Sequence, residues 1–138
     1  MGVAAGGWRT MLRMNTVAQV FAVVAALVHL GAGTLEAFFY RRPAVRKFLT
    51  GSTADAPEAQ MWRFFIGLYN LFLAVGILVG LVMLHRGDES AGRALVIYVG
   101  CFMTVSGVIF LITHPKLWSG ALGQFVPPGA AVAAALLT

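Results

Sequence analysis

The sequence predicts an all-α fold, a bundle of four transmembrane helices in one domain, residues 1–138. Of its 138 residues, 59% are hydrophobic and 11% are charged, whereas a soluble domain carries about 25% charged residues. Four uninterrupted apolar stretches are each long enough for a helix to cross the ~30 Å core of a bilayer. Because they are continuous rather than alternating, and open sheets cannot cross lipid, we expect helices rather than barrel strands.

The four expected spans differ in their polar content. They cover residues 15–39, 64–84, 94–113 and 117–137. The first contains Glu36, whereas the other three have no charged residue in their interior. The first span is therefore the place to look for a buried polar site.

The connecting segments predict where the chain turns. Loop 41–63 is the only long one, and its mixture of basic and apolar residues is typical of a short interfacial helix. A polar turn is expected at 85–93, where Ser90 or Asp88 would cap the third helix. A tighter turn at 114–116 predicts an antiparallel pair formed by the last two helices.

The basic residues lie between the apolar stretches and give the chain a net charge of +5. That distribution is typical of membrane topology and of contact with anionic head groups, and it argues against binding to nucleic acid. The side with the first and third loops holds six Lys and Arg residues, and the side with both termini holds four. The positive-inside rule therefore favours both termini outside. A signal peptide is not expected, because the first apolar stretch exceeds the usual ~7–15 residues.

Small and polar residues mark the helix faces expected to pack together, because they let backbones approach closely. On the first helix they recur at spacings of three and four residues: Ala18, Ala22, Ala25, His29, Ala32 and Glu36. On the second helix, Gly76 and Gly80 form a GxxxG motif, which is compatible with a homodimer or a larger membrane complex. On the fourth, Pro127 and Pro128 remove two N–H donors and favour a kink whose free carbonyls need other partners.

Five polar residues form the candidate ligand-binding site: His29, Glu36, Tyr69, Asn70 and Gln124. Ionisable residues inside a membrane are costly and therefore indicate function. His29 and Glu36 are seven residues apart, so they share one helix face with about 10.5 Å between them along the axis.

Each of these residues also has a structural interpretation. Glu36 stands near the end of its helix, where it could pair at head-group level with one of three arginines: Arg41, Arg42 or Arg63. His29 could bond to a neighbouring helix, and the two amides could join helices by hydrogen bonds.

No metal site and no cofactor are expected. His29 and Glu36 are too far apart along one helix to share an ion without further ligands. The sequence contains no phosphate-binding loop, haem motif or dinucleotide fingerprint. Cys101, the one cysteine, cannot form an intramolecular disulfide.

Three motifs are similar to those of a known family. They are His29-Leu30 with Leu35-Glu36, the stretch Gly67-Leu68-Tyr69-Asn70-Leu71-Phe72-Leu73-Ala74, and Gln124-Phe125-Val126-Pro127. On these motifs the chain resembles DUF1304, a family of small bacterial membrane proteins of unknown function, over about residues 17–137. The resemblance implies a four-helix protein of the bacterial cytoplasmic membrane and supplies no reaction. Polar residues of the family pattern are replaced here at Val28 and at Phe65-Ile66.

We therefore expect a small integral membrane protein that binds a lipid-like or small amphiphilic ligand, or a membrane partner, through the polar site. Glu36 and His29 would anchor a polar head, and the other three residues would orient it. One alternative is an enzyme acting on a lipid or isoprenoid, with Glu36 and His29 as acid and base. The other is a proton-coupled exporter of small molecules.

Overall fold

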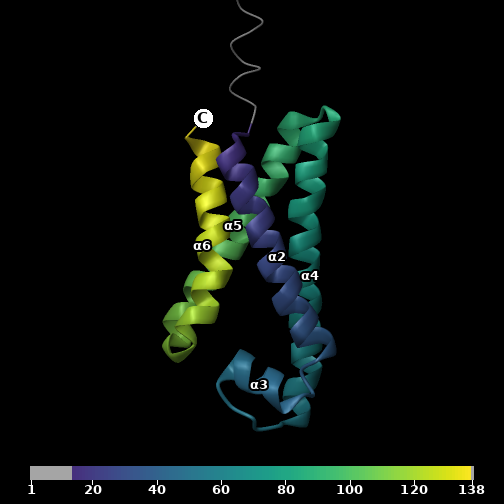
Figure 1. Cartoon of the computed structure of the whole chain (residues 1–138), viewed down its shortest axis with the longest axis vertical. Helices are drawn as coiled ribbons and strands as arrows, with labels where there is room; N and C mark the ends of the chain where they lie inside the picture. Colours follow the sequence, from purple (N-terminus) through teal and green to yellow (C-terminus); the bar gives the residue numbers. More distant parts are fainter. Residues whose placement is uncertain (1–13, 138) are drawn as a thin grey trace, which may run out of the picture.

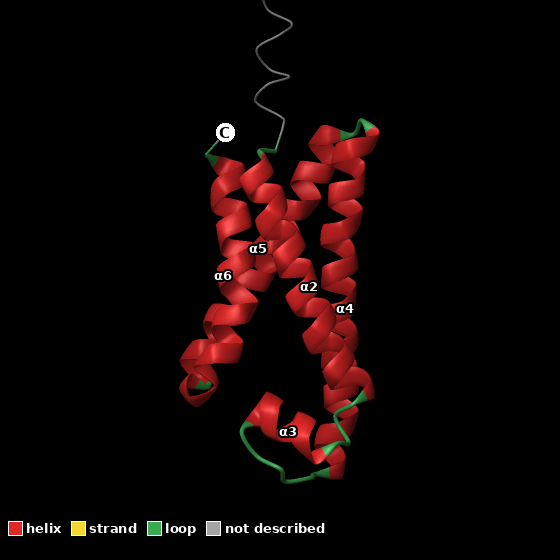
Figure 2. Cartoon of the chain, viewed as in Figure 1, coloured by secondary structure: helices red, strands yellow, loops and turns green. Residues whose placement is uncertain are grey.

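The computed structural model describes residues 14–137, which form helices joined by short connections (Figure 2). In chain order the elements are α2 (Thr16–Phe38), α3 (Pro43–Thr50), α4 (Pro57–Arg86), α5 (Glu89–Thr113), the 3₁₀ helix η1 (Pro115–Leu117) and α6 (Trp118–Leu136). No strand occurs within residues 14–137. The all-α fold class is confirmed.

Three helices of the described chain, α2, α4 and α5, are long and apolar enough to cross a membrane. They contain most or all of the first three expected spans, although α4 begins at Pro57 rather than at residue 64 and α5 at Glu89 rather than at residue 94. Pro57 fits the first helical turn, because an N–H group at that position would have no hydrogen-bond acceptor within the helix. The last helix, α6, is 19 residues long, and its crossing of the membrane stays a prediction.

The four long helices form a closed ring. α2 packs against α4 and α6, and α5 packs against the same two helices from the other side (Figure 1). The start of α2, the end of α6 and the α4–α5 turn lie at one end of the ring. The short helix α3 lies at the opposite end, beside the end of α2 and the start of α4, and it runs crosswise to the long helices.

Small residues form much of the centre of this ring, beside a few larger buried side chains such as Ile77 and Met103. Ala18, Ala22, Ala25 and Ala26 of α2 are fully buried, as are Ala74 and Ala135. Large apolar side chains such as Leu27, Phe72 and Ile112 instead point outward and are exposed. This inverts the order of a soluble protein and matches helices surrounded by lipid. The expected stripe on α2 is confirmed, except that Ala32 is half-buried and Gly33 takes its place in the core.

Glycines set the closest helix contacts. A Cβ atom on Gly67 of α4 would lie 2.5 Å from the backbone nitrogen of Ala37 and 2.7 Å from the carbonyl oxygen of Gly33, both on α2. No side chain fits there. The GxxxG pair on α4 faces α5 of the same chain, where a Cβ on Gly80 would lie 2.8 Å from Val96 Cγ2.

The connections follow local chemistry. Asp88 caps α5 by accepting a hydrogen bond from the Ala91 N–H at 3.3 Å, so this one of the two expected caps is confirmed. Gly87, with φ of 100°, ends α4 in the left-handed conformation that glycine tolerates best. The turn between these helices is shorter than expected. The short helix expected in loop 41–63 is present as α3, and α6 continues as a helix through Pro127 and Pro128.

The loop that carries α3 is held by one buried side chain. Arg46 donates hydrogen bonds to the carbonyl oxygens of Arg41 at 2.6 Å and Thr53 at 3.0 Å. It also pairs with Asp55, with 3.6 Å between Nη1 and Oδ2. These bonds join the two ends of the segment that separates α2 from α4, so this segment is an ordered part of the fold.

Replacing Gly33 with alanine tests the α2–α4 contact. The added Cβ would lie 2.7 Å from the Gly67 carbonyl oxygen, so the helices must separate. We expect unfolding in detergent micelles to require about 1–3 kcal/mol less free energy. The control is Gly31→Ala on the same helix, where no atom lies within 4 Å and helix propensity favours alanine by about 0.5–1 kcal/mol. Equal stability of the two variants would contradict the close contact.

Candidate functional site

The candidate site is centred on Glu36, in the last turn of α2. Its side chain is buried, with 5% of the residue exposed, and faces α4. On α4 the contact glycine Gly67 has Arg63 four residues before it and Asn70 three residues after it, so all three share one helix face. The close approach at Gly67 therefore brings both polar side chains within reach of the carboxylate.

Both carboxylate oxygens of Glu36 accept a hydrogen bond from α4. Arg63 Nη1 donates to Oε1 at 3.0 Å, and Asn70 Nδ2 donates to Oε2 at 2.7 Å. The Arg63 side chain is 28% exposed, against 6% for Glu36, so the ion pair reaches from the protein interior to the surface. An ionised carboxylate away from water is stable only when paired and hydrogen-bonded, and this arrangement provides both.

The structure selects among the three arginines expected to pair with Glu36. Arg63 forms the ion pair, and its guanidinium carbon also lies 5.7 Å from the centre of the Tyr40 ring. Arg42 instead lies over the ring of Phe39, 5.0 Å from its centre. The structural interpretation of Glu36 as one member of an ion pair is thus confirmed for Arg63.

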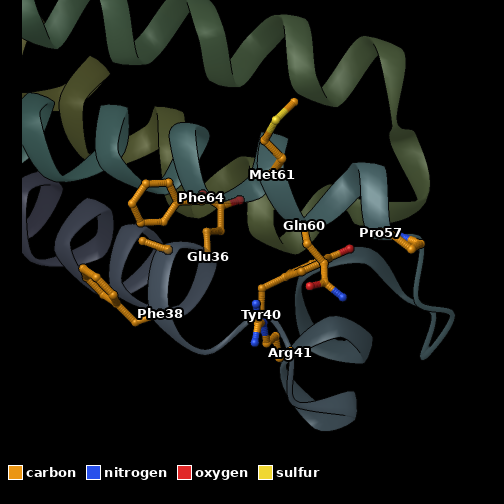
Figure 3. Close-up of a pocket in the computed structure, with 9 residues that line it drawn as sticks. Glu36, Phe38, Tyr40, Arg41, Pro57, Gln60, Met61 and Phe64 are labelled. Carbon is orange, nitrogen blue, oxygen red and sulfur yellow. The ribbon is translucent and has the colours of Figure 1, made fainter.

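A pocket of about 430 Å³ opens beside Glu36, between the end of α2 and the start of α4 (Figure 3). Its polar lining comes from four residues: Glu36, Tyr40, Arg41 and Gln60. Its apolar lining is formed by Ala37, Phe38, Pro57, Met61 and Phe64. Polar groups and aromatic rings therefore line the same cavity, which suits a ligand with a polar end and an apolar end.

The five residues expected to form the site are not all brought together. Glu36 and Asn70 are in direct contact. His29 is 2% exposed, and its Nδ1 lies 3.0 Å from the carbonyl oxygen of Ala25 in its own helix rather than in a neighbouring one. Tyr69 is 63% exposed and does not line the pocket. Gln124 is half-buried on α6, and among residues 14–137 it has no hydrogen bond to the other four.

Sequence reasoning missed the pocket residues Tyr40, Arg41 and Gln60 as a group. Tyr40 stands four residues after Glu36, a spacing that would place both on one face of a helix. However, α2 ends at Phe38, between the two residues. Gln60 was harder to recognise from the sequence, because it stands in a segment expected to be a loop. In the structure this segment is already helical, since α4 begins at Pro57. Within residues 14–137, no group of three or more metal-ligating side chains is present.

The fold and the site define an all-helical protein with helices of membrane-spanning character and an ion-paired carboxylate at the end of one of them. Comparison with known families shows to which family the chain belongs. Residues 23–136 match the family described as "Protein of unknown function (DUF1304)". The chain belongs to this family, as its motifs indicated. No curated protein and no solved structure matches the chain.

A double-mutant cycle tests the ion pair. We expect Glu36→Gln and Arg63→Gln to couple by about 1–2 kcal/mol in the free energy of unfolding, because the two side chains form one partly buried ion pair. The matched cycle combines Glu36→Gln with Arg42→Gln, which removes the same charge from a residue that contacts Phe39 instead. That cycle is expected to be additive within about 0.5 kcal/mol. Equal coupling in both cycles would show that only net charge matters.

Proposed function

We propose that this protein is an integral membrane protein that binds a small lipid-like amphiphile, with the ligand's polar head in the pocket beside Glu36. The observation that carries the proposal is the lining of that pocket, which combines an anchored carboxylate with aromatic and aliphatic walls. A pocket of this composition suits a molecule that is polar at one end only.

The position of the pocket along the helices supports this proposal. α2 and α4 each contain a stretch apolar enough to cross a membrane, and the pocket lies where α2 ends and α4 begins, next to the basic residues Arg41 and Arg42. Lys and Arg at the end of a transmembrane helix stand at the level of the lipid head groups. A ligand head in the pocket would therefore be at the same depth as the heads of the surrounding lipids.

The apolar wall of the pocket offers a surface on which the ligand's apolar tail could lie. Phe38, Met61 and Phe64 line the pocket and are also exposed on the outer surface of the described chain. Phe38 and Phe64 contact each other edge to face, with 6.5 Å between ring centroids. A tail leaving the pocket over these rings would pass directly into the hydrocarbon of the bilayer.

The Glu36 carboxylate can still accept hydrogen bonds from a ligand, although it is already paired with Arg63. Each carboxylate oxygen has two lone pairs and accepts one hydrogen bond here. A hydroxyl or amide of a ligand head could bond to the remaining positions. Asn70 and Arg63 hold the carboxylate in place, and His29 belongs to the packing of α2.

This proposal explains the geometry better than the alternative functions do. Acid–base catalysis by Glu36 and His29 requires both at one substrate, whereas in this arrangement they have separate partners on α4 and on α2. An exporter with a broken helix would use α6 as the break, and α6 is helical through both prolines.

Orientation follows from charge. Within residues 14–137, the end of the bundle with α3 carries six Lys and Arg residues and the other end carries two, Arg86 and Arg93, so we place the α3 end in the cytoplasm. With α6 as a fourth span, both termini would lie outside the cytoplasmic membrane of a bacterium.

Native mass spectrometry of the protein released from nanodiscs made from native membranes tests this function, with Phe64→Ala as the variant. Phe64 lines the pocket, and removing its ring deletes part of the wall for the tail. We expect wild type to retain an amphiphile and this variant to lose about 90% of it, since burying a phenyl ring contributes about 1.5–3 kcal/mol.

Phe65→Ala is the matched control, because Phe65 is the next residue, is similarly exposed and does not line the pocket. It is expected to retain the ligand as wild type does. No adduct on wild type, or equal loss in both variants with folding preserved, would overturn the proposed function.

A further inference from the structure

Two charged residues line the pocket, and only one of them is paired. Glu36 forms an ion pair with Arg63. Arg41 lines the pocket and is exposed, and among residues 14–137 its guanidinium makes no ion pair, hydrogen bond or ring contact. The pocket mouth therefore carries one uncompensated positive charge.

A second group at the same place lacks a partner. Tyr40 is 7% exposed and lines the pocket, yet its hydroxyl has no hydrogen bond to any residue in the described part of the chain. The hydroxyl is not fully enclosed, so it is accessible from the pocket, where it can donate a hydrogen bond to water or to a ligand. The guanidinium of Arg63 fixes the Tyr40 ring from one side, 5.7 Å from its centre.

From these two groups we infer that the ligand is an anionic amphiphile, whose phosphate or carboxylate head is held by the Arg41 guanidinium and the Tyr40 hydroxyl. This inference rests on the proposed function and specifies the ligand class of the same pocket. The planar guanidinium can bind two oxygens of such a head at once, and the tyrosine hydroxyl donates one further hydrogen bond.

The surroundings of Arg41 suit this role. Its carbonyl oxygen accepts a hydrogen bond from Arg46 at 2.6 Å, so its backbone is fixed while its side chain is left unpaired. In Figure 3, Tyr40, Arg41 and Gln60 gather on one side of the pocket, and Phe38 and Phe64 lie on the other. The anionic head and the apolar tail would thus lie on opposite sides of one cavity.

The carboxylate of Glu36 does not repel this head. The ion pair with Arg63 neutralises it, and Asn70 donates to its second oxygen. With Arg41 included, the charges of Glu36, Arg63 and Arg41 sum to one positive charge, which matches a head group carrying one negative charge, such as a phosphodiester or a carboxylate.

The test uses the full chain in nanodiscs of phosphatidylcholine that contain phosphatidylglycerol of the same acyl chains. Native mass spectrometry measures which lipid stays bound. We expect wild type to retain phosphatidylglycerol in preference to phosphatidylcholine, and Arg41→Gln to reduce this preference about tenfold, the effect of losing a charged hydrogen-bonding partner. Tyr40→Phe is expected to reduce it about threefold, because only a neutral donor is lost.

The matched control is Arg42→Gln, which removes one positive charge from the adjacent residue outside the pocket lining. It is expected to keep the preference of wild type. Retention of both lipids in equal amounts by wild type, or equal loss of preference in Arg41→Gln and Arg42→Gln, would overturn the anionic ligand while leaving the proposed function standing. Retention of neither lipid would overturn both.

A final comparison separates a lipid from a free anion. Inorganic phosphate added to the protein in detergent is expected not to displace phosphatidylglycerol, because the tail contributes to binding through Phe38 and Phe64. If inorganic phosphate displaced phosphatidylglycerol at a concentration similar to that of the lipid, the site would recognise the anion alone. An amphiphile would then be excluded as the specific ligand.

Discussion

The contact between Gly33 and Gly67 brings the backbones of α2 and α4 closer than any side chain would permit. The candidate site depends on this approach, since Arg63 and Asn70 flank Gly67 on α4 and reach Glu36 only because the helices nearly touch. Without this approach, the buried carboxylate of Glu36 would have no hydrogen-bonding partner on α4, and the free-energy penalty would be several kcal/mol. Packing and electrostatics are thus coupled at one crossing point.

Much of the fold could be predicted because helices of membrane-spanning character follow simple rules of length and packing. Uninterrupted apolar stretches indicated the helices, and small residues at spacings of three and four identified the inner face of α2. The first and last residues of the helices were harder to predict. α4 begins within a polar segment, where Pro57 starts a helix that hydropathy alone does not reveal. The role of the GxxxG pair also depended on tertiary structure, because the motif does not specify whether its partner is α5 or a second chain.

The site was predictable in part for a related reason. Glu36 and Asn70 stood out as polar residues within apolar helices, and they are in contact. Tyr69 and Gln124 had the same chemical character, but their positions around the helix axis direct one outward and leave the other on α6, without a hydrogen bond to the described members of the set. Tyr40 and Arg41 follow the last residue of α2, where helical periodicity no longer predicts direction.

One feature at the far end of the bundle bears on how the chain is assembled. Asn15 caps α2 by accepting a hydrogen bond from the Ala18 N–H, and it also donates one to the carbonyl oxygen of Ala134, 119 residues later in the sequence. This bond between α2 and α6 can therefore form only after α6 has been synthesised. During translation α2 and α4 can associate early through their glycines, whereas the ring of four helices can close only once α6 is present. A nascent chain of this protein would stay an open assembly of three helices until α6 joins it.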